Sequence, residues 1–97
     1  MALPWIESNR AIITVLGRDQ IGIIAWVSGR LAEHSVNILD ISQTILNEFF
    51  TMIMVVDLEP ANLELVALSR MLEDQGRDKG IQVKVQHEDI FTFMHRI

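Results

Sequence analysis

The order of strand-like and helix-like stretches is the feature of this 97-residue sequence that most restricts its fold. Short β-branched or alternating runs predict strands, and apolar residues three or four positions apart predict helices. These patterns predict strands at 11–16, 37–46, 49–58 and 81–87, helices at 21–35 and from 60 to 76 or 80, and a short tail helix at 89–97. The βαββαβ order predicts an α+β, ferredoxin-like sandwich, in which an antiparallel sheet of order 4132 carries both helices on one face.

Turn residues and helical faces support this order. Asn47 and Glu48 separate two β-like runs and predict a hairpin. Pro60 and Asn62 suit the first turn of the second helix. The residues expected to face the core from the two helices are Ile24, Val27, Leu31, Leu65, Leu68 and Leu72.

The strands at 11–16 and 49–58 would be central in this sheet, and both are apolar on their two faces. Strand 81–87 alternates strictly in polarity, as expected of an edge. Because helices cover one face only, the second face needs another cover. We favour a partner sheet or strand, and therefore a homodimer, over the alternative that the tail at 90–97 folds across this face.

Composition restricts the surroundings of the protein. A formal net charge of −5 and scattered Lys and Arg residues argue against direct binding to nucleic acid. The lack of cysteine excludes disulfides and thiolate zinc sites. Neither a signal peptide nor a stretch of about 18 uncharged apolar residues is present. We expect a cytoplasmic protein that does not enter a membrane, with residues 11–97 as a single domain and residues 1–10 as an N-terminal extension.

Residues 17–52, GRDQIGIIAWVSGRLAEHSVNILDISQTILNEFFTM, closely resemble the ACT domain family. The similarity is greatest to the small single-ACT proteins related to the glycine cleavage system transcriptional repressor. It lies in a GxDxxG loop formed by Gly17, Asp19 and Gly22, in the helix that follows, and in VNILDISQ at residues 36–43. The order of elements continues to match up to His87, so the resemblance covers most of the chain.

The resemblance implies a non-catalytic regulatory module in which two copies pair and bind a small ligand, usually an amino acid. The ligand would lie in a crevice between the loop after the first strand of one copy and the start of the second strand of the other. It implies no metal and no cofactor, and any regulatory effect would pass through a partner protein. Carried over to this sequence, the ligand-binding positions are Gly17, Asp19, Gln20, Ile21, Gly22, Asn37 and Ile38.

The chemistry of the loop agrees in part with this assignment. Gly17 and Gly22 allow backbone conformations that side chains forbid, and they bring the free N–H groups of a helix start near a carboxylate. Asp19 would meet the ammonium group of an amino acid. Two plainer interpretations stay open: Asp19 is the N-cap of the first helix, and Asn37 is only a turn or strand-start residue.

Other function classes have weaker support. A structural oligomerisation domain would have the same fold with an empty crevice. A small enzyme on this fold, such as an acylphosphatase, would need a phosphate loop after the first strand, where Arg18 is a candidate but Asp19 would repel phosphate. RNA binding through the open sheet face would need stacking aromatics where the central strands carry aliphatic residues and Met.

The remaining chemistry-bearing residues form no recognisable site. His34, His87 and His95 are far apart and have no nearby thiolate, so we expect no metal site. No serine lies in a GxSxG motif, so we expect no catalytic nucleophile.

Methionine and tryptophan leave two structural questions. Met52 and Met54 share one face of their strand, which predicts a core or a dimer surface. Trp26 lies off the apolar stripe of its helix and is either a contact with a partner or a half-exposed aromatic.

Overall fold

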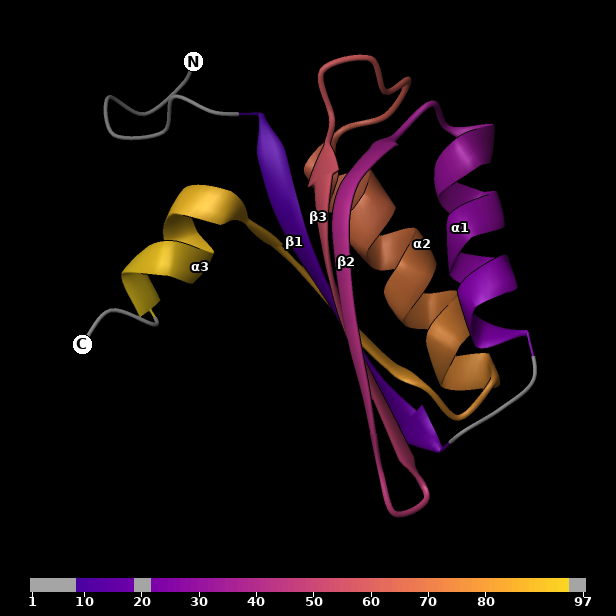
Figure 1. The fold of residues 1–97 in the computed structure, drawn as a ribbon. Helices are drawn as coiled ribbons and strands as arrows, with labels where there is room; N and C mark the ends of the chain where they lie inside the picture. The colour runs from indigo at the N-terminus through magenta and orange to yellow at the C-terminus, as the bar shows by residue number, and fades with distance from the viewer. Residues whose placement is uncertain (1–8, 19–21, 95–97) are drawn as a thin grey trace.

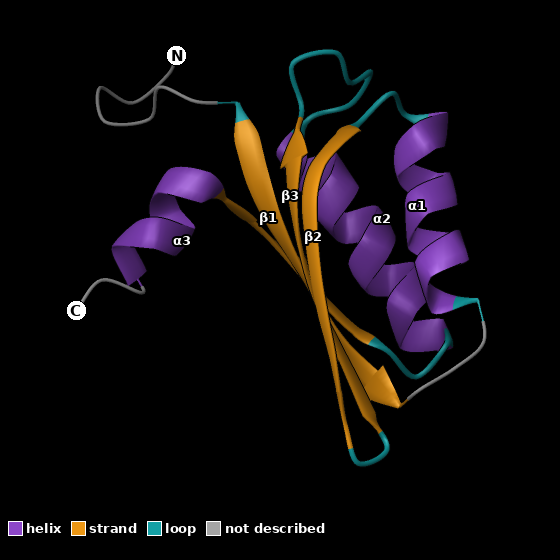
Figure 2. Ribbon diagram, viewed as in Figure 1, coloured by secondary structure: helices purple, strands orange, loops and turns teal. Residues whose placement is uncertain are grey.

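The computed structural model describes residues 9–18 and 22–94. The elements are β1 (Arg10–Arg18), α1 (Ile23–Glu33), β2 (Asn37–Leu46), β3 (Phe49–Asp57), α2 (Leu65–Asp78), β4 (Gln82–His87) and α3 (Glu88–Met94) (Figure 1). The strands form one antiparallel sheet of order β2-β3-β1-β4, which is the predicted order 4132 counted from the other edge. Helices α1 and α2 cover one face of the sheet, and α3 lies on the other side (Figure 2). None of the helices in the described ranges is long and apolar enough to cross a membrane.

The core lies between the sheet and the two helices α1 and α2. In the centre of the sheet, Ile13 of β1 pairs with Met54 of β3, and Val15 pairs with Met52. All four side chains are fully buried. Side chains alternate along a strand, so the residues between them point to the opposite, open face. Of the two predicted places for Met52 and Met54, the core or a dimer surface, the structure shows the core.

Helix α1 packs Ile23, Val27 and Leu31 against the sheet. The prediction that Ile24 faces the core is wrong, because this side chain is 41% exposed. Ile23 and Ile24 lie four and three residues before Val27, and both spacings fit a helical face. The stripe that contacts the sheet is too narrow for both, and Ile24 points to the side of α1 that faces β2.

Helix α2 begins at Leu65, later than predicted. Pro60 and Asn62, the predicted first turn, lie in the loop before it. The Asn62 backbone N–H donates to the His34 carbonyl O at 3.0 Å, and Asn62 Oδ1 lies 3.0 Å from His34 Nδ1. These contacts join the loop before α2 to the loop after α1, so Asn62 connects two loops instead of starting a helix.

The end of α2 depends on a glycine in the left-handed region. Gly80 has a φ of 72° and follows the C-cap of α2. Its backbone N–H donates to the Arg77 carbonyl O at 3.1 Å, and the Ile81 N–H donates to the Gly76 carbonyl O at 2.8 Å. These bonds satisfy the last carbonyls of the helix. Of the two predicted ends, Gly80 therefore terminates α2, whereas Gly76 is buried within it.

Trp26 lies between α1 and α2. Its indole Nε1 donates to Gln75 Oε1 at 3.3 Å, and Lys79 Nζ lies 5.6 Å from the ring centroid. The side chain is half-buried and packs against the core. Since these partners belong to the same chain, the structure favours a half-exposed aromatic over a contact with another protein.

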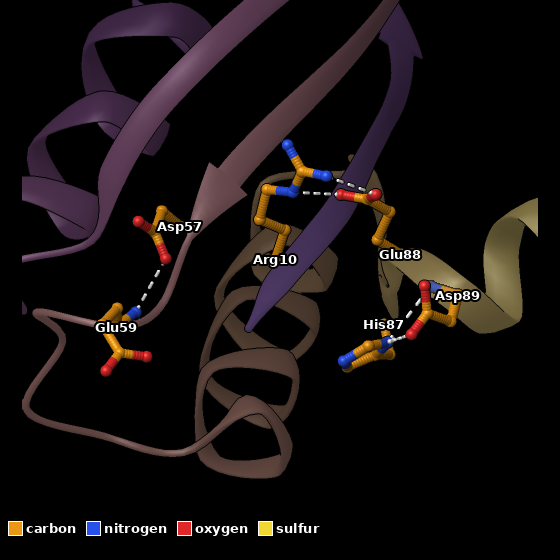
Figure 3. A network of polar contacts seen from close by, with 6 residues as sticks. All are labelled: Arg10, Asp57, Glu59, His87, Glu88 and Asp89. Atoms are coloured by element: carbon orange, nitrogen blue, oxygen red, sulfur yellow. Dashed lines mark hydrogen bonds and ion pairs between the residues drawn. The ribbon is translucent and has the colours of Figure 1, made fainter. Parts of the chain in front are cut away.

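Helix α3 shields one end of the open face. Arg10 holds its first residue: Nε and Nη2 lie 2.6 and 2.9 Å from the two carboxylate oxygens of Glu88 (Figure 3). Ile12, near this end, is only 7% exposed, whereas Leu16 and Phe49 at the other end are 41% and 51% exposed. Helix α3 thus covers part of the face, as the alternative to a partner sheet predicted, and residues 95–97 of the predicted tail lie outside the described residues.

Candidate functional site

The predicted ligand-binding loop joins β1 to α1. Gly17 is the penultimate residue of β1 and pairs with Phe50 of β3. Gly22 directly precedes α1, and its φ of 93° lies in the left-handed region that favours glycine. The remaining predicted loop residues, Asp19, Gln20 and Ile21, lie outside the described residues.

The N-cap residue of helix α1 has no side chain that could cap the helix. This residue is Gly22, and the Trp26 backbone N–H donates to the Gly22 carbonyl O at 2.8 Å. The first turn contains no acidic residue. The N–H groups of Ile23 and Ile24 have no acceptor within the helix, and together with the helix dipole they attract an anion. Gly22 occupies the N-cap position, and Asp19, the predicted alternative N-cap, lies outside the described residues.

A groove of about 730 Å³ opens beside Gly22, between the start of α1 and the edge strand β2. Gln43 and Ile45 point into it from the helix side of the sheet, since they pair with Met52 and Phe50, which face the core. Among the described residues that line it, Gln43 alone has a polar side chain. These lining residues are Gly22, Ile23, Ile24, Ala25, Gln43, Ile45 and Phe50.

The second half of the predicted site lies at the other end of the sheet. Asn37, the first residue of β2, pairs with Asp57, which in turn pairs with Arg10 of β1. Gly17 follows Arg10 by seven residues, a separation of about 24 Å along the strand. The end of β1 and the start of β2 are accordingly far apart (Figure 1). A single copy does not bring Asn37 and Ile38 to the loop.

Comparison with protein families identifies this architecture. Residues 9–86 match the model of the ACT domain. The chain belongs to the ACT domain family. A UPF0237 protein of Methanocaldococcus jannaschii is 51% identical over 89 residues, which are 92% of this ACT domain chain and 99% of that protein. A UPF0237 protein of Bifidobacterium longum is 52% identical over 89 residues, again 92% of this chain and 99% of the relative.

Solved structures agree with the fold of this ACT domain. An ACT domain protein from Streptococcus pneumoniae is 41% identical, with a TM-score of 0.75 over 88% of this chain and 96% of that one. A putative glycine cleavage system transcriptional repressor is 20% identical, with a TM-score of 0.68 over 79% of this chain and 44% of that one. The second likeness shows the fold alone.

The two edge strands of the ACT domain sheet differ in how well they are protected against pairing with another strand. Edge strand β4 spans six residues and carries Lys84 on the open face. Edge strand β2 spans ten residues, of which Asp40 is the only charged one and none is Pro, Lys or Arg. Lysine, proline and short length protect an edge against pairing with another strand. Strand β2 is therefore the edge that is open to pairing.

Chemistry other than binding finds little support at this site. Arg18, the candidate phosphate-binding arginine, has its Nη1 at 3.7 Å from Glu48 Oε2, so an acidic group stands beside it. Within residues 9–18 and 22–94, no group of three or more His, Cys, Asp or Glu side chains is placed to hold a metal ion.

Sequence reasoning missed most of the groove. Gln43 and Ile45 were assigned to a strand but not to the ligand-binding positions, and Ile24 was placed in the core. A signal was present, because Gln43 and Ile45 alternate on the same face of β2 as Ile41, which is 41% exposed. That signal places the residues on one face, but it does not show that the first turn of α1 lies opposite them.

Proposed function

We propose that this ACT domain is a non-catalytic regulatory module that binds an amino acid in a crevice shared by two copies of the chain. It acts in the cytoplasm as a homodimer paired along β2, without a metal or cofactor, and residues 11–97 serve as one domain. The observation that carries the proposal is the groove beside Gly22, which opens at the unprotected edge of the sheet. A ligand in this groove is within reach of a second copy.

Two-fold symmetry along β2 would complete the site. If β2 pairs antiparallel with β2 of a second copy about a two-fold axis near its middle, the start of each strand lies beside the end of the other. Ile38 of the second copy then lies near Ile45, which lines the groove and is on the same, helix-side face of the sheet. Asn37 and Ile38, far from the loop in their own copy, thus come next to the groove of the other.

Each charge of an amino acid has a complementary group in this arrangement. The start of α1 offers N–H groups to the carboxylate. The ammonium group meets Asp19, and the Asn37 side-chain amide of the second copy adds a hydrogen bond. Gly17 and Gly22 shape the loop, in which Gln20 and Ile21 complete the contact surface, while Ile38 contributes a main-chain group.

Regulation follows from the position of the ligand between two copies. A ligand that contacts both copies binds one dimer geometry better than another and shifts the population toward it. The chain contains no catalytic residues in this proposal, so a partner protein reads the change in geometry.

A mixed-subunit experiment tests the shared crevice. Asp19→Ala removes the loop carboxylate and Asn37→Ala removes the amide at the start of β2, so each variant alone should bind its amino acid weakly. When the two variants exchange subunits, about half of the dimers contain one chain of each kind. One crevice in each mixed dimer is intact, so about a quarter of all crevices should regain full affinity in a calorimetric titration.

Two controls make the result decisive. Glu64→Ala removes an exposed carboxylate directly before α2, at the end of that helix away from the loop, and should bind like the unmodified chain. The melting temperature without ligand should be the same in all variants. Loss of binding in both single variants without recovery on mixing would show that the crevice is not shared between copies.

A second function, an oligomerisation domain without ligand, is favoured by one observation. Ile38 of the second copy would lie near Ile45 in the paired arrangement, and both are apolar and at least partly exposed. If the second copy fills the groove with its own side chain, the dimer forms and no amino acid raises its melting temperature.

A further inference from the structure

The geometry points to one class of ligand: an amino acid with a large apolar side chain, which enters the groove beside Gly22. This inference rests on the proposed function and extends it by naming what the crevice selects. It is carried by the residues of the groove, on the helix side of the sheet, and needs no residue outside the described ranges.

Buried and exposed apolar side chains line the groove together. Ile23 and Phe50 are only 4% and 5% exposed, so they form a floor that the core holds in place. Ile24 from α1 and Ile45 from β2 are 41% and 57% exposed. Removing these two side chains from water is favourable, and an apolar group in the groove would do so.

The described residues that line the groove carry no charge. Gln43 supplies the one polar side chain among the lining residues, and within the described part of the chain its amide has no hydrogen-bond partner. A charged ligand side chain would lose its hydration here without meeting an opposite charge on these residues. Arg18 and Glu48, at the nearby ends of β1 and the hairpin, lie 3.7 Å apart and offset each other.

The size of the groove favours a long side chain over a short one. Its volume of about 730 Å³ lies within the range of small-molecule sites, about 300 to 1,000 Å³. Glycine or alanine would leave Ile24 and Ile45 in contact with water. Leucine, methionine or phenylalanine would cover both, and their shared property is a large apolar surface.

Calorimetric titration of the full chain with amino acids matched in size tests the inference. Leucine against asparagine and valine against threonine are such pairs, since each differs mainly in polarity. We expect leucine to bind at least about tenfold more tightly than asparagine, and valine more tightly than threonine. Aspartate and lysine should compete poorly with leucine.

Two variants of residues that line the groove test where the side chain of the bound amino acid lies. Ile45→Thr should weaken leucine binding about tenfold, whereas the control Ile53→Thr, which changes a residue of β3 that points to the opposite face and is 39% exposed, should not. Gln43→Glu places a carboxylate in the groove and should weaken leucine binding while it strengthens lysine binding. Sedimentation of each variant checks that the dimer persists.

The outcomes separate this inference from the proposed function. Tighter binding of serine, glycine or aspartate than of leucine would overturn the inference and leave an amino acid sensor in place. Leucine affinity unchanged in both Ile45→Thr and Gln43→Glu would show that its side chain lies elsewhere. If none of the twenty amino acids binds, the inference and the proposed function both fail.

Discussion

Gly76 of α2 and Val83 of β4 lie so close that no methyl group fits between the helix and the strand. A Cβ added to Gly76 would be 2.9 Å from Val83 Cγ2 and 3.0 Å from the Ile81 carbonyl O. Gly76 is buried, and both neighbours belong to the segment that enters β4. This contact sets how near α2 approaches the sheet.

Gly76→Ala should therefore lower stability. Alanine gains about 0.5–1 kcal/mol in helix propensity over glycine, but the clash with a backbone oxygen requires α2 or β4 to move, at a cost of about 1–3 kcal/mol. We expect a net loss in the free energy of unfolding, measured by urea denaturation. Gly29→Ala in α1 is the matched control, because a Cβ there meets nothing within 4 Å, and it should stabilise the protein by about 0.5–1 kcal/mol. Equal gains at the two sites would contradict the close approach.

A lysine on β2 should weaken the homodimer. Ser42 is exposed near the middle of β2, so in a two-fold pair the two introduced ammonium groups of Ser42→Lys would lie close together. We expect about 1 kcal/mol of repulsion, roughly a fivefold weaker dimer, in sedimentation equilibrium at low salt. Gln82→Lys on the opposite edge should leave the dimer unchanged. If both variants dissociate equally, or neither does, the interface is not along β2.

Ligand binding should appear as a shift in melting temperature. A ligand at 100 times its dissociation constant adds about 2.7 kcal/mol to the free energy of unfolding. In a screen of the twenty amino acids, we expect a response that disappears in Asp19→Ala and persists in Glu64→Ala. A flat screen at millimolar concentrations would favour the oligomerisation domain.

The ion pair between Arg10 and Glu88 should contribute modestly to stability. Two short contacts join the groups, but their side chains are 47% and 22% exposed, and solvent screens the attraction. A double-mutant cycle with Arg10→Met and Glu88→Gln should give a coupling of about 0.5–1 kcal/mol that decreases in high salt. A coupling above about 3 kcal/mol would mean that α3 depends on this pair far more than its exposure allows.

The sequence by itself determined the order of the elements and their place in the sheet. Strand β2 begins and ends at the predicted residues 37 and 46, and Asn47 adopts a positive φ of 58° in the predicted turn. The alternation at 81–87 marked β4 as an edge. These features are local: residue spacing reports which side chains share a face, and turn residues report where the chain reverses.

Only the tertiary structure decided what lies opposite each face. Spacing fits both Ile23 and Ile24 as core residues, and the position of α1 over the sheet buries one and leaves the other beside the groove. The separation of Asn37 from Gly17 likewise follows from strand register. Both depend on distances between segments remote in sequence, which periodicity within one segment does not contain. The groove exists because α1 and β2 approach each other, and neither segment specifies that approach alone.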